Sequence, residues 1–213
     1  MTRVRLGLLI PSSNTVLEPL AARQAGLQTH VNRLPVYDVA LGAESQAQFA
    51  MEGQVAAAKV LCDAHVDRIV WGGTSASWLG FAHDQAFAQK VSAQTGVPTT
   101  TCVLQINGQL AALGARRIGM VTPYTEDVAQ QINRNYEAAG FEIGGWSNHG
   151  GTLSRDFASI PEAQIEDMIH RVAQQGVEAI VIMCTNVAAA DLAARLAPEL
   201  NIPIIDSAQA SLS

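Results

Sequence analysis

The sequence is poor in charge and in aromatic residues: only 15% of its 213 residues are charged and 5% are aromatic. Its net charge is −6 and it contains no run of Lys or Arg, which argues against a nucleic-acid partner. No apolar stretch approaches the roughly 20 residues that a membrane span needs. The first residues also lack the apolar region and cleavage site of a secretory signal. We therefore expect a cytoplasmic protein without nucleic-acid or membrane partners.

Cysteine is scarce as well. Cys62, Cys102 and Cys184 are too few and too irregularly spaced for a disulfide framework or a zinc site. The five histidines form no pair at helical spacing and no cluster with cysteine, so we expect no metal. The apolar content of 48% is typical of a globular protein with a substantial core.

The sequence contains a two-fold internal repeat. The segment Arg5–Pro11 recurs as Arg117–Pro123, and Asp67–Thr74 recurs as Glu178–Thr185. The repeat predicts two similar lobes of roughly 100 residues, each large enough for its own core.

Strand-like and helix-like patterns alternate along the chain, which predicts an α/β fold with mainly parallel sheets flanked by helices. Apolar runs predict strands at residues 4–10, 29–34, 68–71, 98–101, 117–121, 141–146, 179–183 and 202–206. Helical spacing predicts helices at residues 16–26, 46–65, 79–95, 103–113, 126–139, 161–175 and 187–196, and a polar loop is expected at 147–155. We expect the lobes to span residues 1–114 and 115–213, with a final segment that could cross back. No further helical pattern follows Ser207, which indicates a truncated or partly ordered C-terminus.

Hydroxyl and amide side chains follow four of the predicted strands. They lie in Pro11-Ser12-Ser13-Asn14-Thr15, Gly73-Thr74-Ser75-Ala76-Ser77, Thr122-Pro123-Tyr124-Thr125 and Cys184-Thr185-Asn186. Ligands of parallel α/β sheets bind beyond the carboxyl ends of the strands, where unpaired backbone N–H groups favour an anion. None of these loops contains Lys or Arg, so hydroxyl and N–H groups would hold a carboxylate. Any one loop could be an ordinary helix cap, but four in related places favour a site.

Cys184 ends an apolar strand pattern, where a cysteine can be a small buried hydrophobe. Its place before a helix N-terminus, which would lower the thiol pKa, favours a reactive thiol instead. Cys62 and Cys102 are expected in the core, and Trp71 in the core or the wall of a cleft. The repeat aligns Gly73 with Cys184, so only one half of the chain carries a thiol at this position.

The motifs Ile10-Pro11-Ser12-Ser13-Asn14-Thr15, Gly73-Thr74-Ser75-Ala76-Ser77, Tyr124 and Cys184-Thr185 resemble the aspartate/glutamate racemase superfamily. The most similar branch contains the maleate cis–trans isomerases and arylmalonate decarboxylases, and the resemblance covers essentially the whole chain. It implies two pseudo-symmetric α/β lobes with a cofactor-independent active site in the cleft between them. It also implies catalytic roles for Cys184 and Tyr124. Substrate binding would fall to Pro11, Ser12, Asn14, Gly73, Thr74, Ser75 and Thr185.

Departures from the family patterns bear on the reaction. Racemases and maleate isomerases carry a cysteine on each side of the cleft, whereas arylmalonate decarboxylases resemble this chain in having a glycine at the position of Gly73. The Pro-Ser-Ser-Asn-Thr loop resembles the isomerases instead. These enzymes also have an asparagine where this chain has Arg155 or Asp156.

The leading hypothesis is a malonate-type decarboxylase that acts on a small carboxylic acid through an enediolate or carbanion. Cys184 would protonate this intermediate, and Gly73 would leave space for a bulky substituent. One alternative is a maleate cis–trans isomerase that uses Cys184, and another is a non-catalytic carboxylate-binding protein. A homo-oligomer remains open.

Overall fold

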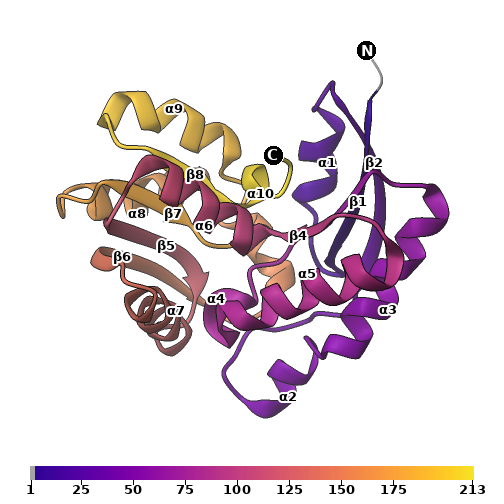
Figure 1. Cartoon of the computed structure of the whole chain (residues 1–213). Coiled ribbons are helices and arrows are strands. Elements are labelled where there is room, and N and C mark those ends of the chain that lie inside the picture. Colours follow the sequence, from indigo (N-terminus) through magenta and orange to yellow (C-terminus); the bar gives the residue numbers. More distant parts are fainter. Residues whose placement is uncertain (1–2) are drawn as a thin grey trace.

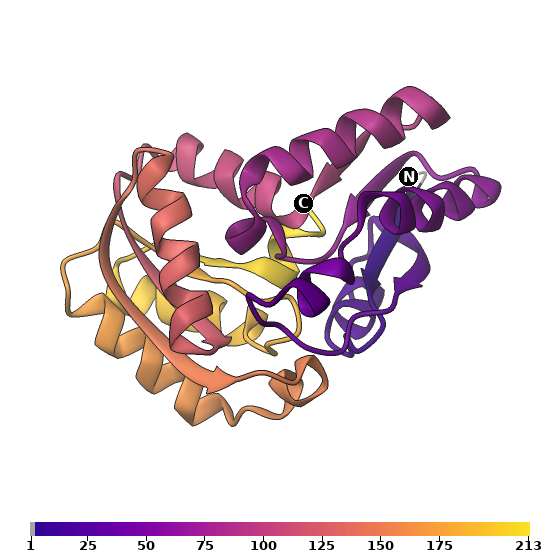
Figure 2. The same cartoon turned by 90° about the horizontal axis from the view of Figure 1, so that it is seen from below.

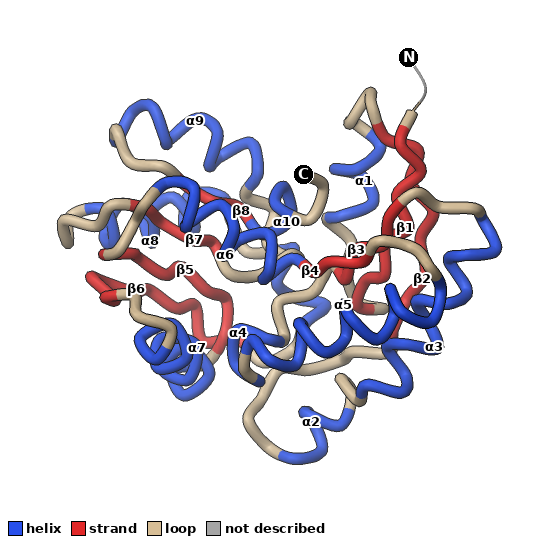
Figure 3. Tube along the Cα trace, viewed as in Figure 1, coloured by secondary structure: helices blue, strands red, loops and turns tan. Residues whose placement is uncertain are grey.

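The computed structural model describes residues 3–213, and its strands form two separate four-stranded sheets, both parallel (Figures 1 and 3). The first sheet has the order β2-β1-β3-β4, with β1 (Val4–Pro11), β2 (Leu27–Leu34), β3 (Arg68–Trp71) and β4 (Thr99–Thr101). The second has the matching order β6-β5-β7-β8, with β5 (Arg117–Tyr124), β6 (Glu142–Gly151), β7 (Ala179–Ile182) and β8 (Ile204–Asp206). The matching order confirms the predicted fold of two pseudo-symmetric α/β lobes.

Helices connect the successive strands, as parallel pairing requires. They are α1 (Leu17–Ala22), α2 (Ala43–Ala47), α3 (Met51–Leu61), α4 (Ala76–Leu79), α5 (Phe81–Thr95), α6 (Cys102–Leu113), α7 (Glu126–Ala138), α8 (Glu162–Ala173), α9 (Ala190–Leu200) and α10 (Ser207–Ala210). Two 3-10 turns, η1 (Cys62–Ala64) and η2 (Ser154–Ser159), complete the connections. Among residues 3–213, no helix has the length and apolar character needed to cross a bilayer.

The central strands position the functional loops because both of their faces are covered. Residues of β1 from Leu6 onward are buried, and every residue of β7 is buried, as expected for central strands of a parallel sheet. Since the strands of each sheet are parallel, their carboxyl ends lie at one edge of that sheet. The polar loops after β1, β3, β5 and β7 start at these edges.

Two helices are exchanged between the lobes. The helix α6 follows β4 of the first sheet, but Figures 1 and 2 show it among the helices of the second lobe, where Asn107 accepts a hydrogen bond from the Tyr136 hydroxyl of α7 (2.9 Å). The helix α10 follows β8 of the second sheet, but Ala208 and Leu212 pack in one buried cluster with residues of β1, β3 and α1. The two helices begin next to one another, since the Cys102 thiol donates to the Ser207 carbonyl (3.2 Å).

The helix predicted over residues 46–65 is wrong as a single element. It is divided into α2 and α3, because the Gln48 side chain accepts a hydrogen bond from the Tyr37 N–H (2.7 Å) and donates to the Asp38 carboxylate (2.6 Å). The predicted 79–95 helix is likewise divided at Gly80, whose φ of 105° ends α4 before α5 begins. Such a φ is readily adopted only by glycine.

Three further expectations differ from the structure. A helix does follow the last strand, because the Asp206 side chain caps α10, which begins at Ser207. Much of the expected 147–155 loop is strand, because β6 continues beside β5 as far as Gly151. The helix expected at 187–196 is α9 and begins only at Ala190, because the N–H groups of Val187 and Ala189 bond to carbonyls within the preceding turn. The position of this helix start matters for the chemistry of the preceding cysteine.

Candidate active site

A narrow cavity lies between the two lobes, at the carboxyl ends of their sheets. Most of the residues predicted for the site line it, namely Pro11, Gly73, Thr74, Ser75, Tyr124, Cys184 and Thr185. The cavity leaves about 20 Å³ of solvent-sized space, which is about enough for one water molecule. The strand-end motifs of both halves therefore converge on a single small chamber.

Ser12 and Asn14, the other two predicted site residues, lie outside the cavity wall and hold parts of it in place. The Ser12 hydroxyl exchanges hydrogen bonds with the backbone of Val36 (3.1 and 3.3 Å), which fixes the segment after β2. Asn14 is fully buried, and its side-chain oxygen Oδ1 accepts a hydrogen bond from the N–H of Leu17 at the start of α1 (2.9 Å). Its amide donates to the Thr185 hydroxyl of the other lobe (3.1 Å).

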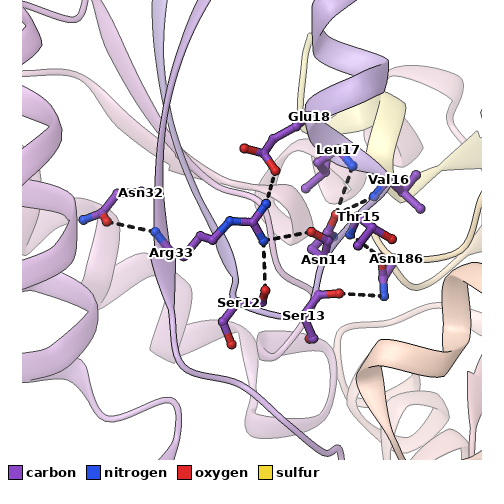
Figure 4. A network of polar contacts seen from close by, with 10 residues as sticks. All are labelled: Ser12, Ser13, Asn14, Thr15, Val16, Leu17, Glu18, Asn32, Arg33 and Asn186. Atoms are coloured by element: carbon purple, nitrogen blue, oxygen red, sulfur yellow. Dashed lines mark hydrogen bonds and ion pairs between the residues drawn. The ribbon is translucent and has the colours of Figure 1, made fainter.

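Contacts between the lobes fix the loop that carries Cys184, and Figure 4 shows those of Asn186 with the loop after β1. The Thr185 hydroxyl donates to the Gly72 carbonyl across the cleft (2.8 Å). The Asn186 side chain accepts from the Thr15 N–H (2.9 Å) and donates to the Ser154 carbonyl (2.7 Å). The loop is therefore bonded to both lobes.

An ion pair supports the loop after β1 from the outer side. Arg33 of β2 donates to the carbonyls of Ser12 and Asn14 (both 2.9 Å) and pairs with the Glu18 carboxylate (Figure 4). This guanidinium points to the backbone of the loop and is absent from the cavity wall. It orders the loop without adding a positive charge to the chamber.

The Cys184 side chain is buried, and this burial raises the pKa of its thiol to about 11. Hydrogen bonds from the Tyr124 hydroxyl and the Asn186 N–H (3.4 Å to sulfur) oppose the rise without cancelling it. The expected lowering of the thiol pKa by a following helix is wrong, because α9 begins only at Ala190. Cys184 is therefore a protonated thiol at neutral pH.

Tyr124 contributes a neutral hydroxyl beside this thiol. Its hydroxyl lies 2.8 Å from Thr74 Oγ1. Burial, and secondarily the neighbouring Cys184, raise the Tyr124 pKa well above its usual value, so the phenol stays protonated. Ser75 is the N-cap of α4, and the N–H groups of Ser77 and Trp78 in that short helix bond to the carbonyls of Thr74 and Ser75. The hydroxyls of Tyr124, Thr74 and Ser75 form an uncharged binding surface for an anion.

The space opposite Cys184 is filled, contrary to the expectation that Gly73 leaves room there. A Cβ atom on Gly73 would lie 2.4 Å from Cζ2 and 2.6 Å from Cε2 of the Trp71 indole. Trp71 is fully buried and its Nε1 donates to Ser75 Oγ (3.2 Å). The indole therefore occupies the place that a side chain at position 73 would need.

The apolar wall of the cavity was not predicted from the sequence. Three close aromatic contacts run along it, Phe49–Trp78, Trp78–Tyr124 and Tyr124–Phe157, with ring centroids 5.3–5.6 Å apart. The Trp78 and Phe157 rings come from α4 and η2, outside the strand-end motifs. One side of the chamber is therefore polar and the other aromatic.

The segment after β2 closes the chamber by pairing with the other lobe. Val39 lines the cavity, and its N–H donates to the Thr152 carbonyl (2.9 Å), while Asp38 forms a β-bridge with Leu153. Arg155 and Asp156 are exposed and are not part of the cavity wall. From the same stretch, Ser154 and Phe157 line the cavity instead.

No charged side chain lines the chamber. Across residues 3–213 no group of three or more His, Cys, Asp and Glu side chains is arranged as a set of metal ligands. The groups that could act chemically within the wall are the thiol, the phenol and the neighbouring hydroxyls.

Comparisons with known proteins agree with this arrangement. A family model described as arylmalonate decarboxylase matches residues 7–212. A maleate isomerase of Nocardia farcinica (strain IFM 10152) is 27% identical, over 97% of this chain and 86% of its own length. An arylmalonate decarboxylase of Bordetella bronchiseptica is 26% identical, over 65% of this chain and 59% of its own length.

Solved structures share the fold. A cysteine-to-serine mutant of the Nocardia farcinica maleate cis–trans isomerase with a covalently bound succinylcysteine intermediate has a TM-score of 0.89 and 22% identity, over 98% of this chain and 89% of its own. A structure of arylmalonate decarboxylase has a TM-score of 0.80 and 22% identity, with the same coverage.

Proposed function

Because the chain belongs to the arylmalonate decarboxylase family, we propose that it is a cofactor-independent decarboxylase of a small malonate-type acid with Cys184 as its single proton donor. The observation that carries the proposal is the state of this thiol. It is buried, protonated at neutral pH, and faces a wall in which Trp71 fills the place of a second thiol at Gly73. One acid on one face suits the protonation of a carbanion and does not suit two-base racemisation.

The polar side of the chamber would bind the carboxylate that stays on the substrate. The hydroxyls of Tyr124, Thr74 and Ser75 can donate to it. When the carboxylate becomes an enediolate, these donors meet a larger negative charge. They therefore stabilise the transition state more than the bound substrate.

The aromatic side would receive the carboxylate that leaves. The side chains of Val39 and Phe49 offer this carboxylate no hydrogen-bond donor, and Trp78 offers only its indole N–H. Loss of CO₂ breaks the bond to the α-carbon and leaves its electron pair in the enediolate. Because the chamber leaves space for about one water, its wall has to widen to admit the substrate, and we expect the segment with Val39 and Phe49 to move.

Protonation of the α-carbon would complete the reaction. The Cys184 S–H bond breaks, a C–H bond forms on the face toward the sulfur, and the thiolate remains. The malonate dianion therefore consumes one proton and yields CO₂ and a monocarboxylate. A single proton donor predicts one product enantiomer from a substrate with two different α-substituents.

The alternative is isomerisation of a maleate-like diacid. It is favoured by the full-length similarity to a maleate isomerase and by the Asn14 loop. That reaction needs a thiolate to add to the double bond. Burial keeps Cys184 protonated, and Gly73 stands at the other cysteine position, so both features favour decarboxylation.

A panel of substituted malonates, with CO₂ release as the readout, tests the proposal. We expect turnover in the wild type, loss of turnover in Cys184→Ser, and unchanged turnover in Cys62→Ser, whose thiol lies outside the cavity. Conversion of maleate to fumarate without CO₂ release would assign the isomerase reaction instead. Thermal stabilisation by malonates without either turnover would indicate a non-catalytic binding protein.

A further inference from the structure

Trp71 contacts two residues of the loop that follows it, and both contacts come from one edge of its indole. Nε1 donates a hydrogen bond to Ser75 Oγ (3.2 Å), and the adjacent ring atom Cε2 would lie 2.6 Å from a Cβ atom on Gly73. All three residues line the chamber. The loop therefore wraps round this edge of the indole, and the absence of a side chain at position 73 allows the close approach.

The backbone of Trp71 is held on both sides because β3 is a central strand of its sheet. Its Cα pairs with Leu9 of β1 and with Thr101 of β4. The N–H of the next residue, Gly72, donates to the Leu9 carbonyl (2.8 Å). The Trp71 side chain is also fully buried. The indole is therefore a fixed part of the chamber wall, against which the loop is ordered.

The chemistry of the two groups determines the direction of the hydrogen bond between Trp71 and Ser75. An indole N–H can only donate, so Ser75 Oγ is the acceptor. The contact between Thr74 and Tyr124 is different, because either hydroxyl can be the donor (2.8 Å). The hydrogen of the Ser75 hydroxyl takes no part in the bond to Trp71 and remains available for another acceptor.

The Ser75 hydroxyl has no second role within residues 3–213. Serine at an N-cap commonly accepts a hydrogen bond from a backbone N–H of the first turn, but the Ser75 side chain makes no such bond to α4. The hydroxyl of Ser77 bonds locally instead, by donating to the Thr74 carbonyl (2.7 Å). Ser75 is fully buried, and in the described part of the chain its hydroxyl donates no hydrogen bond. A buried donor without an acceptor in a chamber wall is suited to a polar group of a ligand.

We propose that Trp71 is a positioning residue that directs the Ser75 hydroxyl to the carboxylate of the substrate; this inference rests on the proposed function. Because the indole N–H occupies one lone pair of Ser75 Oγ, the O–H bond is turned away from Trp71 and toward the chamber. A hydrogen bond received by a hydroxyl also polarises it and makes it a stronger donor. The donor is thus oriented before the enediolate forms, which is the condition for effective stabilisation of a transition state.

The variants Trp71→Phe and Ser75→Ala, alone and combined, test this inference through the kinetics of CO₂ release from a substituted malonate. Phenylalanine keeps an aromatic ring in the core but has no N–H. Loss of an oxyanion donor costs about 10²–10³-fold in kcat, and we expect this loss in Ser75→Ala. Trp71→Phe leaves the donor present but unoriented, so we expect a kcat lower by roughly 10-fold and a smaller change in KM. In the Ser75→Ala background, Trp71→Phe should change kcat by less than about 2-fold, because no hydroxyl remains to be directed.

Trp78 supplies a matched control. Its indole also lines the chamber, and its Nε1 is buried without a hydrogen-bond partner among the described residues. Trp78→Phe should therefore change kcat by the same factor with and without the Ser75 hydroxyl. If Trp71→Phe also acts by one factor in both Ser75 backgrounds, Trp71 only fills space and the inference is wrong.

Binding of malonate to proteins that carry Cys184→Ser separates this inference from the proposed function, because no turnover is expected there. Trp71→Phe should weaken binding, measured by calorimetry, by about 5-fold, which is the worth of one hydrogen bond, and should have no effect when combined with Ser75→Ala. This dependence in a protein whose wild type releases no CO₂ would refute the decarboxylation and retain the role of Trp71. Effects of Trp71→Phe that are independent of Ser75 in both binding and turnover would refute that role.

Discussion

Replacing Gly73 by Ala tests whether the Trp71 indole fills the place of a second catalytic side chain. The added Cβ would lie 2.4 Å from the indole, closer than unbonded carbon atoms approach. Trp71 is fully buried and bonded to Ser75, so it has little freedom to move away. Overpacking of this kind typically costs about 1–3 kcal/mol. In a protein of this size each kcal/mol lowers Tm by roughly 2–4 °C.

The reasoning requires that this cost depends on Trp71. Phenylalanine has a smaller ring than tryptophan, so in Trp71→Phe we expect the cost of adding Gly73→Ala to fall below about 0.5 kcal/mol. The coupling between the two positions would then be about 1–2 kcal/mol, within the range for residues in direct contact. Urea denaturation of the wild type, both single variants and the double variant measures this coupling directly.

A matched glycine supplies the control. Gly108 lies within α6, and a Cβ there would meet nothing within 4 Å. Gly108→Ala should be neutral or stabilising by up to about 1 kcal/mol, through helix propensity alone, in both Trp71 backgrounds. Equal costs of Gly73→Ala in the two backgrounds would refute the steric account of Trp71.

Three other predictions follow from the site and the core. Tyr124→Phe removes the hydroxyl that contacts Thr74 and should lower kcat by about 10²–10³-fold; a change of only a few fold in steady-state kinetics would argue against an enediolate donor. Asp84→Asn should change the pH dependence of stability, because burial raises the Asp84 pKa from 3.8 to about 7 and the neighbouring Thr101 hydroxyl opposes this rise only in part. The raised pKa stabilises the wild type fully below about pH 4, and this stabilisation falls by up to about 4 kcal/mol as the pH rises through 7. Urea titrations at pH 5 and 8 should therefore show a smaller change in the free energy of unfolding for the variant than for the wild type. An equal change in both proteins would contradict the assignment. Asn14→Ala should destabilise by about 1–2 kcal/mol through loss of the cap on α1, measured as a lower Tm, and an unchanged Tm would show that this buried amide is dispensable.

The polar half of the site could be predicted because parallel topology decides where strand ends meet. Thr74, Tyr124 and Cys184 each follow or end a central strand that the apolar pattern identifies. Once the repeat indicates two such sheets, these residues belong at neighbouring edges. The location of the chamber therefore depends on local patterns and connectivity.

The aromatic half could not be predicted in the same way, because it depends on contacts between distant segments. Phe49 lies in the break between α2 and α3, which Gln48 stabilises by bonding to the backbone and side chain of residues 37–38. The helical pattern across this stretch continues through the break. Only the folded chain brings Phe49 to Trp78 and the second lobe.

The properties of Gly73 and Cys184 also depend on the three-dimensional environment. A glycine at position 73 shows in the sequence that a side chain is missing. Only the structure shows that the Trp71 indole fills the space which that side chain would need. A cysteine at a strand end indicates reactivity, but its protonation depends on the depth of burial and on where α9 begins. Both features changed the expected chemistry while leaving the expected location unchanged.

The exchange of α6 and α10 constrains how such a molecule could have arisen by duplication. A half-length chain with four strands would end in a helix that packs on another copy, as α6 packs beside Tyr136 and α10 beside Leu8 in this protein. The half-length ancestor would thus have been a domain-swapped homodimer with two identical strand-end loops. Fusion of its genes would have freed the two loops to diverge, so that one could keep a cysteine while the other became glycine.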